Sequence, residues 1–294
     1  MTGFEAWRTA ARTHTLPAAV VPVLVGSGLA QGSGVFRWDA LLWALLGALA
    51  IQIAANFAND VSDARRGADT PERLGPPRMV ALGVIEPLSM WVATWTAIAV
   101  AAVAAVALTL IAGPVILIVG VVSVMAMLGY VGGPVPYGYR GLGEVFVFVF
   151  FGLVATVGAR FVHDGTAPAE AWLLAIPVGF LVTAILVVNN YRDLETDAAS
   201  GKRTLAVIIG EAKTRNLFDT LVIGAFVSIL VFERVGWTPP WTWIAVLAAP
   251  LSWLPLRVIH RKSSGPELIG ALKGTARLHL VTGILLAVGA AIPV

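Results

Sequence analysis

Long apolar runs constrain this chain more than any other feature of its sequence. Each run is near the roughly 20 residues that a helix needs to cross a bilayer. The runs are continuous rather than alternating, which indicates helices, because lipid tolerates strands only in closed barrels. We expect about nine spans, at about 15–31, 38–59, 87–111, 114–131, 145–163, 171–191, 217–234, 241–258 and 277–293. The tightest connection is predicted at Gly113 and Pro114, which break what would otherwise be an overlong helix. The sequence therefore predicts an all-α membrane protein, with residues 1–294 forming one intramembrane domain and one helical bundle.

Composition excludes a water-soluble protein. Hydrophobic residues make up 58% of the chain and charged residues only 13%, against a usual charged share of about 25%. There is no cysteine, which excludes disulfides, thiolate metal sites and cysteine nucleophiles. The four histidines are scattered, which argues against a histidine-rich metal site. The expected surroundings are a lipid bilayer, and no nucleic-acid partner is expected.

The loops between the runs alternate in character. One set is short and nearly uncharged, and the other is long and polar. The long, polar loops are 60–86, 132–144, 192–216 and 259–276. Of the 20 Lys and Arg residues, only Arg37, Arg160 and Arg234 fall outside the face formed by these loops and the N-terminus. By the positive-inside rule, that face is cytoplasmic and the C-terminus is outside, in a multi-pass protein of the plasma membrane. Lipid headgroup contact accounts for most of these cations.

Two polar motifs close spans on the charged face. The first is Asn56-x3-Asp60-x2-Asp63, and the second is Asn189-x3-Asp193-x3-Asp197. Each spacing places its residues on one face of a helix. The motifs lie four spans apart, which suggests two related four-helix units plus one extra helix.

Carboxylates grouped in this way repel one another unless a cation neutralises them. A set of hard oxygen ligands without His or Cys suits Mg²⁺, which takes the rest of its shell from water and substrate phosphates. Basic residues follow both motifs, including Arg65, Arg73, Arg78, Lys202 and Arg203. Carboxylates, a bound metal ion and basic side chains in one place are typical of a site that binds a diphosphate. An ordinary polar helix end would explain any one Asp, but not two such motifs on one face.

Three other features have simpler explanations. The glycines at 132–133 and 141–143 resemble a nucleotide loop, but no strand precedes them, so a turn between spans is preferred. Tyrosines near the charged face, Tyr139 among them, are expected to be interfacial anchors. Arg160 and His163 lie at the opposite end of a span, where snorkelling explains them.

With these residues in hand, the chain resembles the UbiA-type intramembrane aromatic prenyltransferases. Within that superfamily it is similar to the 1,4-dihydroxy-2-naphthoate polyprenyltransferases of menaquinone synthesis. The stretches that carry the resemblance are Arg12 to Pro17, Asn56 to Asp69 with Arg73 to Pro76, Tyr130 to Glu144, and Asn189 to Val207. The superfamily's first motif often ends in Asp where this chain has Gly67, and an acid follows as Asp69. The naphthoate branch has the same pattern.

The resemblance implies transfer of a polyprenyl group from polyprenyl diphosphate to 1,4-dihydroxy-2-naphthoate, with loss of CO₂ and diphosphate, giving demethylmenaquinone. It implies that Mg²⁺ is held by the catalytic residues Asp60, Asp63, Asp193 and Asp197, with Asp69 as a further metal candidate. The candidate substrate-binding residues are Asn56, Asn59, Arg65, Arg73, Arg78, Arg140, Asn189, Tyr191, Lys202 and Arg203. A carboxylate on the acceptor needs a cation, and Arg12, Arg140 and Lys202 all lie on the charged face.

Two alternatives remain open at this point. One is a prenyltransferase for another acceptor, such as 4-hydroxybenzoate. The other is a membrane transporter, in which polar residues would gather near the bilayer centre. Here they gather at one face, which argues against transport. The sequence does not predict the oligomeric state.

Overall fold

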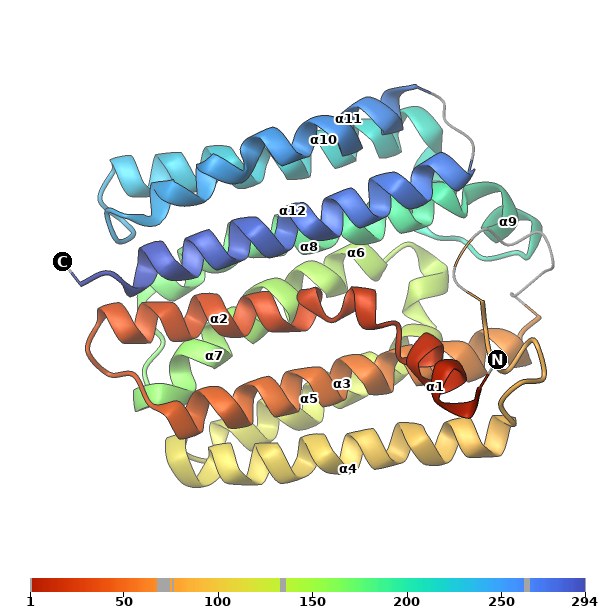
Figure 1. The fold of residues 1–294 in the computed structure, drawn as a ribbon, viewed down its shortest axis with the longest axis horizontal. Coiled ribbons are helices and arrows are strands. Elements are labelled where there is room, and N and C mark those ends of the chain that lie inside the picture. The colour runs from red at the N-terminus through yellow and green to blue at the C-terminus, as the bar shows by residue number, and fades with distance from the viewer. Residues whose placement is uncertain (1, 68–74, 76, 133–135, 262–264, 294) are drawn as a thin grey trace.

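The computed structural model describes every residue except 1, 68–74, 76, 133–135, 262–264 and 294. All regular elements among the described residues are helical, and the long helices run back and forth along the longest axis of the molecule (Figure 1). The predicted all-α bundle is confirmed.

The long helices are connected by short helical segments. The single long helices are α2(Pro17–Gly32), α3(Trp38–Arg65), α4(Pro87–Ala112), α5(Val115–Val131), α8(Ala169–Arg192), α10(Leu205–Arg234) and α12(Gly265–Ala291). One composite helix joins α6(Gly143–Val147), the π-helical segment η3(Phe148–Val154) and α7(Ala155–Asp164), and another joins η4(Thr242–Ser252) to α11(Trp253–His260). The short elements are α1(Gly3–Ala11), η1(Thr13–Thr15), η2(Tyr137–Arg140) and α9(Leu194–Ala199).

The number of helices that could span a membrane is close to the predicted number of about nine. Among the described residues, 7 helices are long and apolar enough to cross a membrane. An eighth is added if α1 with η1 and α2 count as one span, bent by 48°. The shorter apolar helix Val115–Val131 coincides with the remaining expected run.

Two glycines explain where the helices break. Gly113 has φ +92°, a conformation that favours glycine, and Pro114 follows it, so α4 and α5 are joined by the tight turn that the sequence predicts. Gly210 has φ +78° inside α10 and kinks it. The expected span at 217–234 is therefore only the part of α10 beyond this kink.

Apolar side chains cover the outer surface of α4 and α5. Leu110 is 85% exposed, Leu88 73% and Ile118 66%. A continuous apolar surface of this kind is stable against lipid rather than water. The bundle is that of a multi-pass membrane protein.

Small residues bring α2 close to its neighbours. A Cβ added to Gly26 would lie 2.4 Å from the carbonyl oxygen of Thr156 on α7, and one added to Gly28 would lie 2.4 Å from that of Ala287 on α12. Small residues at transmembrane interfaces allow such close packing. This close packing holds α2 between α7 and α12. It thereby also determines the position of the break between α1 and α2.

The charged loops gather at one end of the bundle. α1, α9 and the N-terminus lie at that end, and the C-terminus lies at the other (Figure 1). Because α3 and α8 both finish at the charged end, the two aspartate motifs come together there, as the sequence predicts.

Candidate functional site

A cavity of about 870 Å³ opens among the helices. Polar residues line one part of it, among them Asn56, Asn59, Asp63, Arg78, Asn189, Asp193 and Lys202. Apolar residues line the rest, including Ala44, Leu108, Ile116 and Val162. Ala44 and Asp63 both lie on α3, roughly 28 Å apart along its axis at 1.5 Å per residue. The cavity therefore has a charged end and a long apolar extension, which suits an amphipathic ligand.

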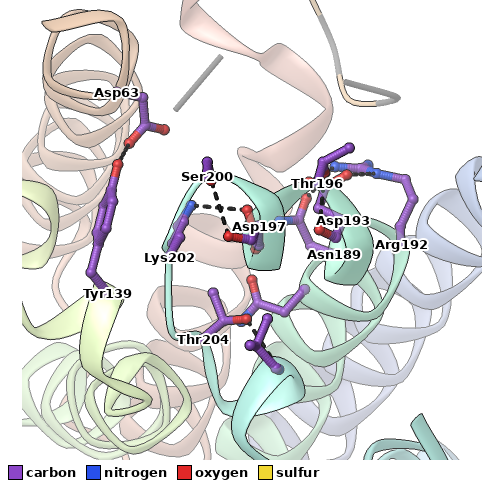
Figure 2. A network of polar contacts seen from close by, with 12 residues as sticks. Asp63, Tyr139, Asn189, Arg192, Asp193, Thr196, Asp197, Ser200, Lys202 and Thr204 are labelled. Carbon is purple, nitrogen blue, oxygen red and sulfur yellow. Dashed lines mark hydrogen bonds and ion pairs between the residues drawn. The ribbon is translucent and has the colours of Figure 1, made fainter. Parts of the chain in front are cut away.

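Asp63 is the centre of the first polar group on the cavity wall. The side chain is buried, and its Oδ2 accepts a hydrogen bond of 2.6 Å from Arg78 Nη2. Its Oδ1 accepts one of 2.6 Å from the hydroxyl of Tyr139 (Figure 2). Asp63 thus ties the end of α3 to two separate loops.

Asp193 is the centre of the second group. Arg192 donates from Nε and Nη2 to its two oxygens, at 2.8 and 2.6 Å (Figure 2). The same Nη2 donates to Asn189 Oδ1 at 3.0 Å. Both Arg192 and Asp193 are buried, so the ion pair is neutralised within the protein.

Lys202 lies at the turn after α9 and connects the two groups. Its backbone N–H donates to the Asp197 carbonyl at 2.9 Å, and its Nζ lies 3.7 Å from Asp197 Oδ1. The same Nζ lies 5.0 Å from the centre of the Tyr139 ring. Tyr139 therefore contacts Asp63 of the first motif and Lys202, which pairs with Asp197 of the second motif (Figure 2).

Tyr139 was expected to be only an interfacial anchor. Any tyrosine near a membrane face fits that expectation, so the residue type alone did not indicate a role in the site. The one available signal was its position between Tyr130 and Glu144, one of the stretches that carry the family resemblance. The structure adds Tyr139 and Arg192 to the residues that shape the site.

Asp60 has a different environment from Asp63. Its Oδ2 accepts a hydrogen bond from the backbone N–H of Met79 at 3.1 Å, and its Oδ1 accepts one from Val80 at 3.0 Å. Asp60 is completely buried. Neither Asp60 nor Asp197 is among the described residues of the cavity wall. In this arrangement Asp60 holds a loop, and its role toward a metal stays a prediction.

Several predicted binding residues lie away from the described cavity wall. Arg140 and Arg203 are exposed, and the exposed Arg65 stacks over the Trp91 ring at 5.7 Å. Arg73 and the metal candidate Asp69 lie outside the described residues.

Tyr191, another predicted binding residue, lies near the end of α8 and packs against α10. Its hydroxyl donates to Glu211 at 2.7 Å and accepts from Arg215 at 2.7 and 2.9 Å. These contacts give Tyr191 a role in joining two helices.

Asn56 anchors the break between α1 and α2. Its Nδ2 donates to the Ala11 carbonyl at 2.9 Å and to Thr15 Oγ1 at 3.0 Å. Arg12 has φ +48°, an uncommon conformation for a residue other than glycine, and it ends α1 at a break where the chain bends by 48°. The bend brings Arg12 and His14 to the cavity wall. The sequence makes Arg12 one of three candidate cations for the acceptor carboxylate, but it does not single out His14, because sequence spacing gives no angle between α1 and α2.

Aromatic rings line the cavity beside its charged end. Tyr137 and Phe146 are stacked with centroids 3.8 Å apart, and Tyr130 meets the Tyr137 ring edge-on at 5.5 Å. The Tyr137 hydroxyl donates to the Ala126 carbonyl at 2.6 Å, which orients the ring. The negative faces of such rings attract a cation.

The donor set fits Mg²⁺. Asp63 and Asp193 line the cavity together with the amide side chains of Asn59 and Asn189, so the available ligands are hard oxygens. Among the described residues, no three His, Cys, Asp or Glu side chains are grouped so that they could hold an ion. Mg²⁺ usually takes one or two carboxylates from a protein and the rest of its shell from water and substrate phosphates.

We expect Asp60→Asn to destabilise the fold. The amide would face one of the two backbone N–H groups with its own NH₂, leaving a buried donor unpaired, which costs about 1–3 kcal/mol. The expected fall in the thermal midpoint is several degrees, measured by unfolding of the detergent-solubilised protein. Glu195→Gln, at an exposed carboxylate of α9, is the control. An unchanged midpoint for Asp60→Asn would contradict the loop-holding role.

Comparison with known proteins identifies the family of this chain. The model of the UbiA prenyltransferase family matches residues 19–270. A relative from Mycobacterium tuberculosis, named 1,4-dihydroxy-2-naphthoate octaprenyltransferase, is 38% identical over 98% of this chain and 97% of its own length. A relative of the same name from Mycobacterium leprae is 37% identical over 98% of this chain and 96% of its own.

A solved structure has the same fold. It is a UbiA homologue from Archaeoglobus fulgidus bound to GPP and Mg²⁺, with a TM-score of 0.68 and 12% identity over 96% of this chain and 99% of its own. The bundle, the two aspartate motifs at its charged end and the full-length relatives lead to one conclusion: this chain belongs to the UbiA prenyltransferase family.

Proposed function

We propose that this chain transfers a polyprenyl group from polyprenyl diphosphate to 1,4-dihydroxy-2-naphthoate, with release of CO₂ and diphosphate. The observation that carries the proposal is the cavity, which joins a charged end to a long apolar extension. A prenyl diphosphate has the same division into a charged head and an apolar tail. The naphthoate acceptor follows from the two mycobacterial relatives, which bear that name and match almost the whole chain.

The charged end supplies the groups that a diphosphate needs. Arg78 and Lys202 carry donors at the cavity wall. Mg²⁺ would be held by Asp63 and Asp193, with Asp60 and Asp197 as further predicted ligands. When bound, Mg²⁺ neutralises phosphate oxygens and stabilises the charge on a departing diphosphate. The Archaeoglobus fulgidus neighbour, bound to GPP and Mg²⁺, supports this assignment.

Tyr139 and Arg192 keep the carboxylates in place. The Tyr139 hydroxyl donates to Asp63, and Arg192 donates to Asp193. Groups fixed in advance stabilise developing charge without reorganising at the moment of reaction. Tyr139 also couples the two motifs, so it is a positioning residue for the charged end as a whole.

The reaction balances without another reagent. The C–O bond to the diphosphate breaks, and the electron pair leaves with the diphosphate. The ring carbon that bears the carboxylate forms a C–C bond to the allylic cation. The bond to the carboxylate then breaks, its electrons return to the ring, and CO₂ leaves. The product is the reduced form of demethylmenaquinone.

The aromatic wall protects this cation. Tyr130, Tyr137 and Phe146 present rings to the cavity near its charged end. Their π faces stabilise positive charge without supplying a nucleophile. The apolar remainder of the cavity excludes the water that would otherwise capture the cation.

We expect turnover to require a divalent cation, with Mg²⁺ the most effective. Protein reconstituted in lipid should lose prenyl transfer in excess EDTA and regain it on addition of Mg²⁺, because the ligands are oxygens. The measurement is the rate of diphosphate release. Full turnover in EDTA would remove the metal from the proposal.

The charged end is proposed to face the cytoplasm, because it carries most of the Lys and Arg residues. The chain has no cysteine, so single cysteines can be added to an unreactive background. A membrane-impermeant maleimide should label Ala167→Cys in intact cells, and Ala199→Cys only after permeabilisation. Labelling in the reverse pattern would invert the proposed topology.

The acceptor is tested by competition. With one prenyl diphosphate and both acceptors present, we expect kcat/KM to be at least tenfold higher for 1,4-dihydroxy-2-naphthoate than for 4-hydroxybenzoate, roughly the ratio that a difference of 1.4 kcal/mol gives. The products are separated and quantified by mass spectrometry. Equal or higher kcat/KM for 4-hydroxybenzoate would reject the naphthoate assignment while leaving prenyl transfer in place.

A further inference from the structure

A second set of cations faces the cavity from α12. Lys273 and Arg277 are one helical turn apart, and both line the cavity with Leu272, Ala276 and Leu280. This spacing places all five residues on one side of the helix. Sequence analysis counted the two cations only among those that mark the cytoplasmic face. We call Lys273 and Arg277 the α12 cation pair.

The break before α2 adds further positive charge. η1 packs against α12, and Arg12 and His14 from this break also line the cavity. The positive charge of this break is that of Arg12, which lines the same cavity as Lys273. Groups from two separate elements therefore make one part of the cavity wall positive.

The α12 cation pair is not neutralised within the described protein. Neither Lys273 nor Arg277 makes an ion pair or a hydrogen bond with another described side chain. The carboxylates on the cavity wall have other partners, since Asp63 accepts from Arg78 and Asp193 accepts from Arg192. Both side chains are exposed and line the cavity, so their donors are available to an anion that enters it.

We infer that the α12 cation pair binds the carboxylate of the aromatic acceptor. This inference rests on the proposed function, which brings two anions into one cavity. The diphosphate is assigned to the end where the aspartate motifs, Arg78 and Lys202 meet. The pair on α12 is left for the second anion, the carboxylate of the acceptor.

The chemistry of the pair suits this role. A guanidinium presents two parallel N–H donors that match a carboxylate, and an ammonium adds a point charge beside it. Holding the carboxylate fixes the ring carbon to which it is attached, and that is the carbon proposed to attack the prenyl group. Aromatic molecules without a carboxylate would leave the two charges unpaired, so the site would select acidic acceptors.

Direct binding separates this inference from catalysis. The protein in nanodiscs of neutral lipid is titrated with 1-hydroxy-2-naphthoate, with 1-naphthol, which lacks the carboxylate, and with a prenyl diphosphate. The variants are Lys273→Gln, Arg277→Gln and the double variant. Arg257→Gln, at an exposed cation of α11 that is not on the described cavity wall, is the matched control. The thermal midpoint of each variant verifies folding.

The expected result is selective. Each single variant should weaken 1-hydroxy-2-naphthoate binding about tenfold, the usual effect of losing one charge-assisted hydrogen bond. The double variant should weaken it further, while binding of 1-naphthol and the prenyl diphosphate stays within about twofold. Lys273→Arg, which keeps the charge, should retain most of the affinity for the naphthoate.

Two results would overturn the inference and leave the proposed function standing. One is unchanged naphthoate binding in the double variant, and the other is a loss confined to the prenyl diphosphate, which would assign the pair to that substrate. If the wild-type protein bound the prenyl diphosphate but not the naphthoate, the proposed acceptor itself would be rejected, and the inference with it.

Discussion

A charge buried within a membrane protein needs a partner inside the protein, and this requirement organises the charged end of the bundle. Asp63 accepts from Arg78 and Tyr139, and Asp193 accepts from Arg192. The two contacts of Asp63 also join segments that are separated in sequence, so the same contacts that neutralise charge help determine the shape of the site. Tyr139 matters most, because it contacts both Asp63 of the first motif and Lys202, whose Nζ pairs with Asp197 of the second.

The same need of charged groups for partners explains why the cavity is charged at one end and apolar over the rest of its length. Polar groups at the membrane face have water and one another as partners, whereas the middle of the bilayer offers none. The cavity wall is therefore charged where α3 and α8 end and apolar toward Ala44 and Val162. A substrate with a charged head and a long apolar tail matches this division, and a transported polar solute does not.

Sequence analysis predicted the features that depend on local composition. The apolar runs, the Gly113–Pro114 turn and the position of both aspartate motifs at one end all depend on residues that are close in sequence. Asp60 and Asp63 could not be distinguished, because their spacing gives them one helical face. Only the path of the loop that returns Met79 and Val80 to Asp60 separates their environments.

The remaining site residues depend on tertiary packing. Lys273 and Arg277 face the cavity because of how α12 is rotated against α2 and η1, and an apolar helix with few charges does not reveal that rotation. Arg12 reaches the wall through a left-handed backbone conformation. Tyr139 reaches Asp63 through a loop whose course the sequence does not determine. In each case the sequence shows the residue type, but it does not show the direction in which the side chain points.

The fate of the acceptor carboxylate gives the most direct measurement of the proposed reaction. Protein reconstituted in lipid is given a prenyl diphosphate and 1,4-dihydroxy-2-naphthoate labelled with ¹³C in its carboxylate. Labelled CO₂, diphosphate and prenylated naphthalenediol are then quantified in the same reaction. The proposed reaction predicts equal molar amounts of all three, with no label in the prenylated product. A prenylated product that retains the label, or no prenylated product with this acceptor, would contradict it.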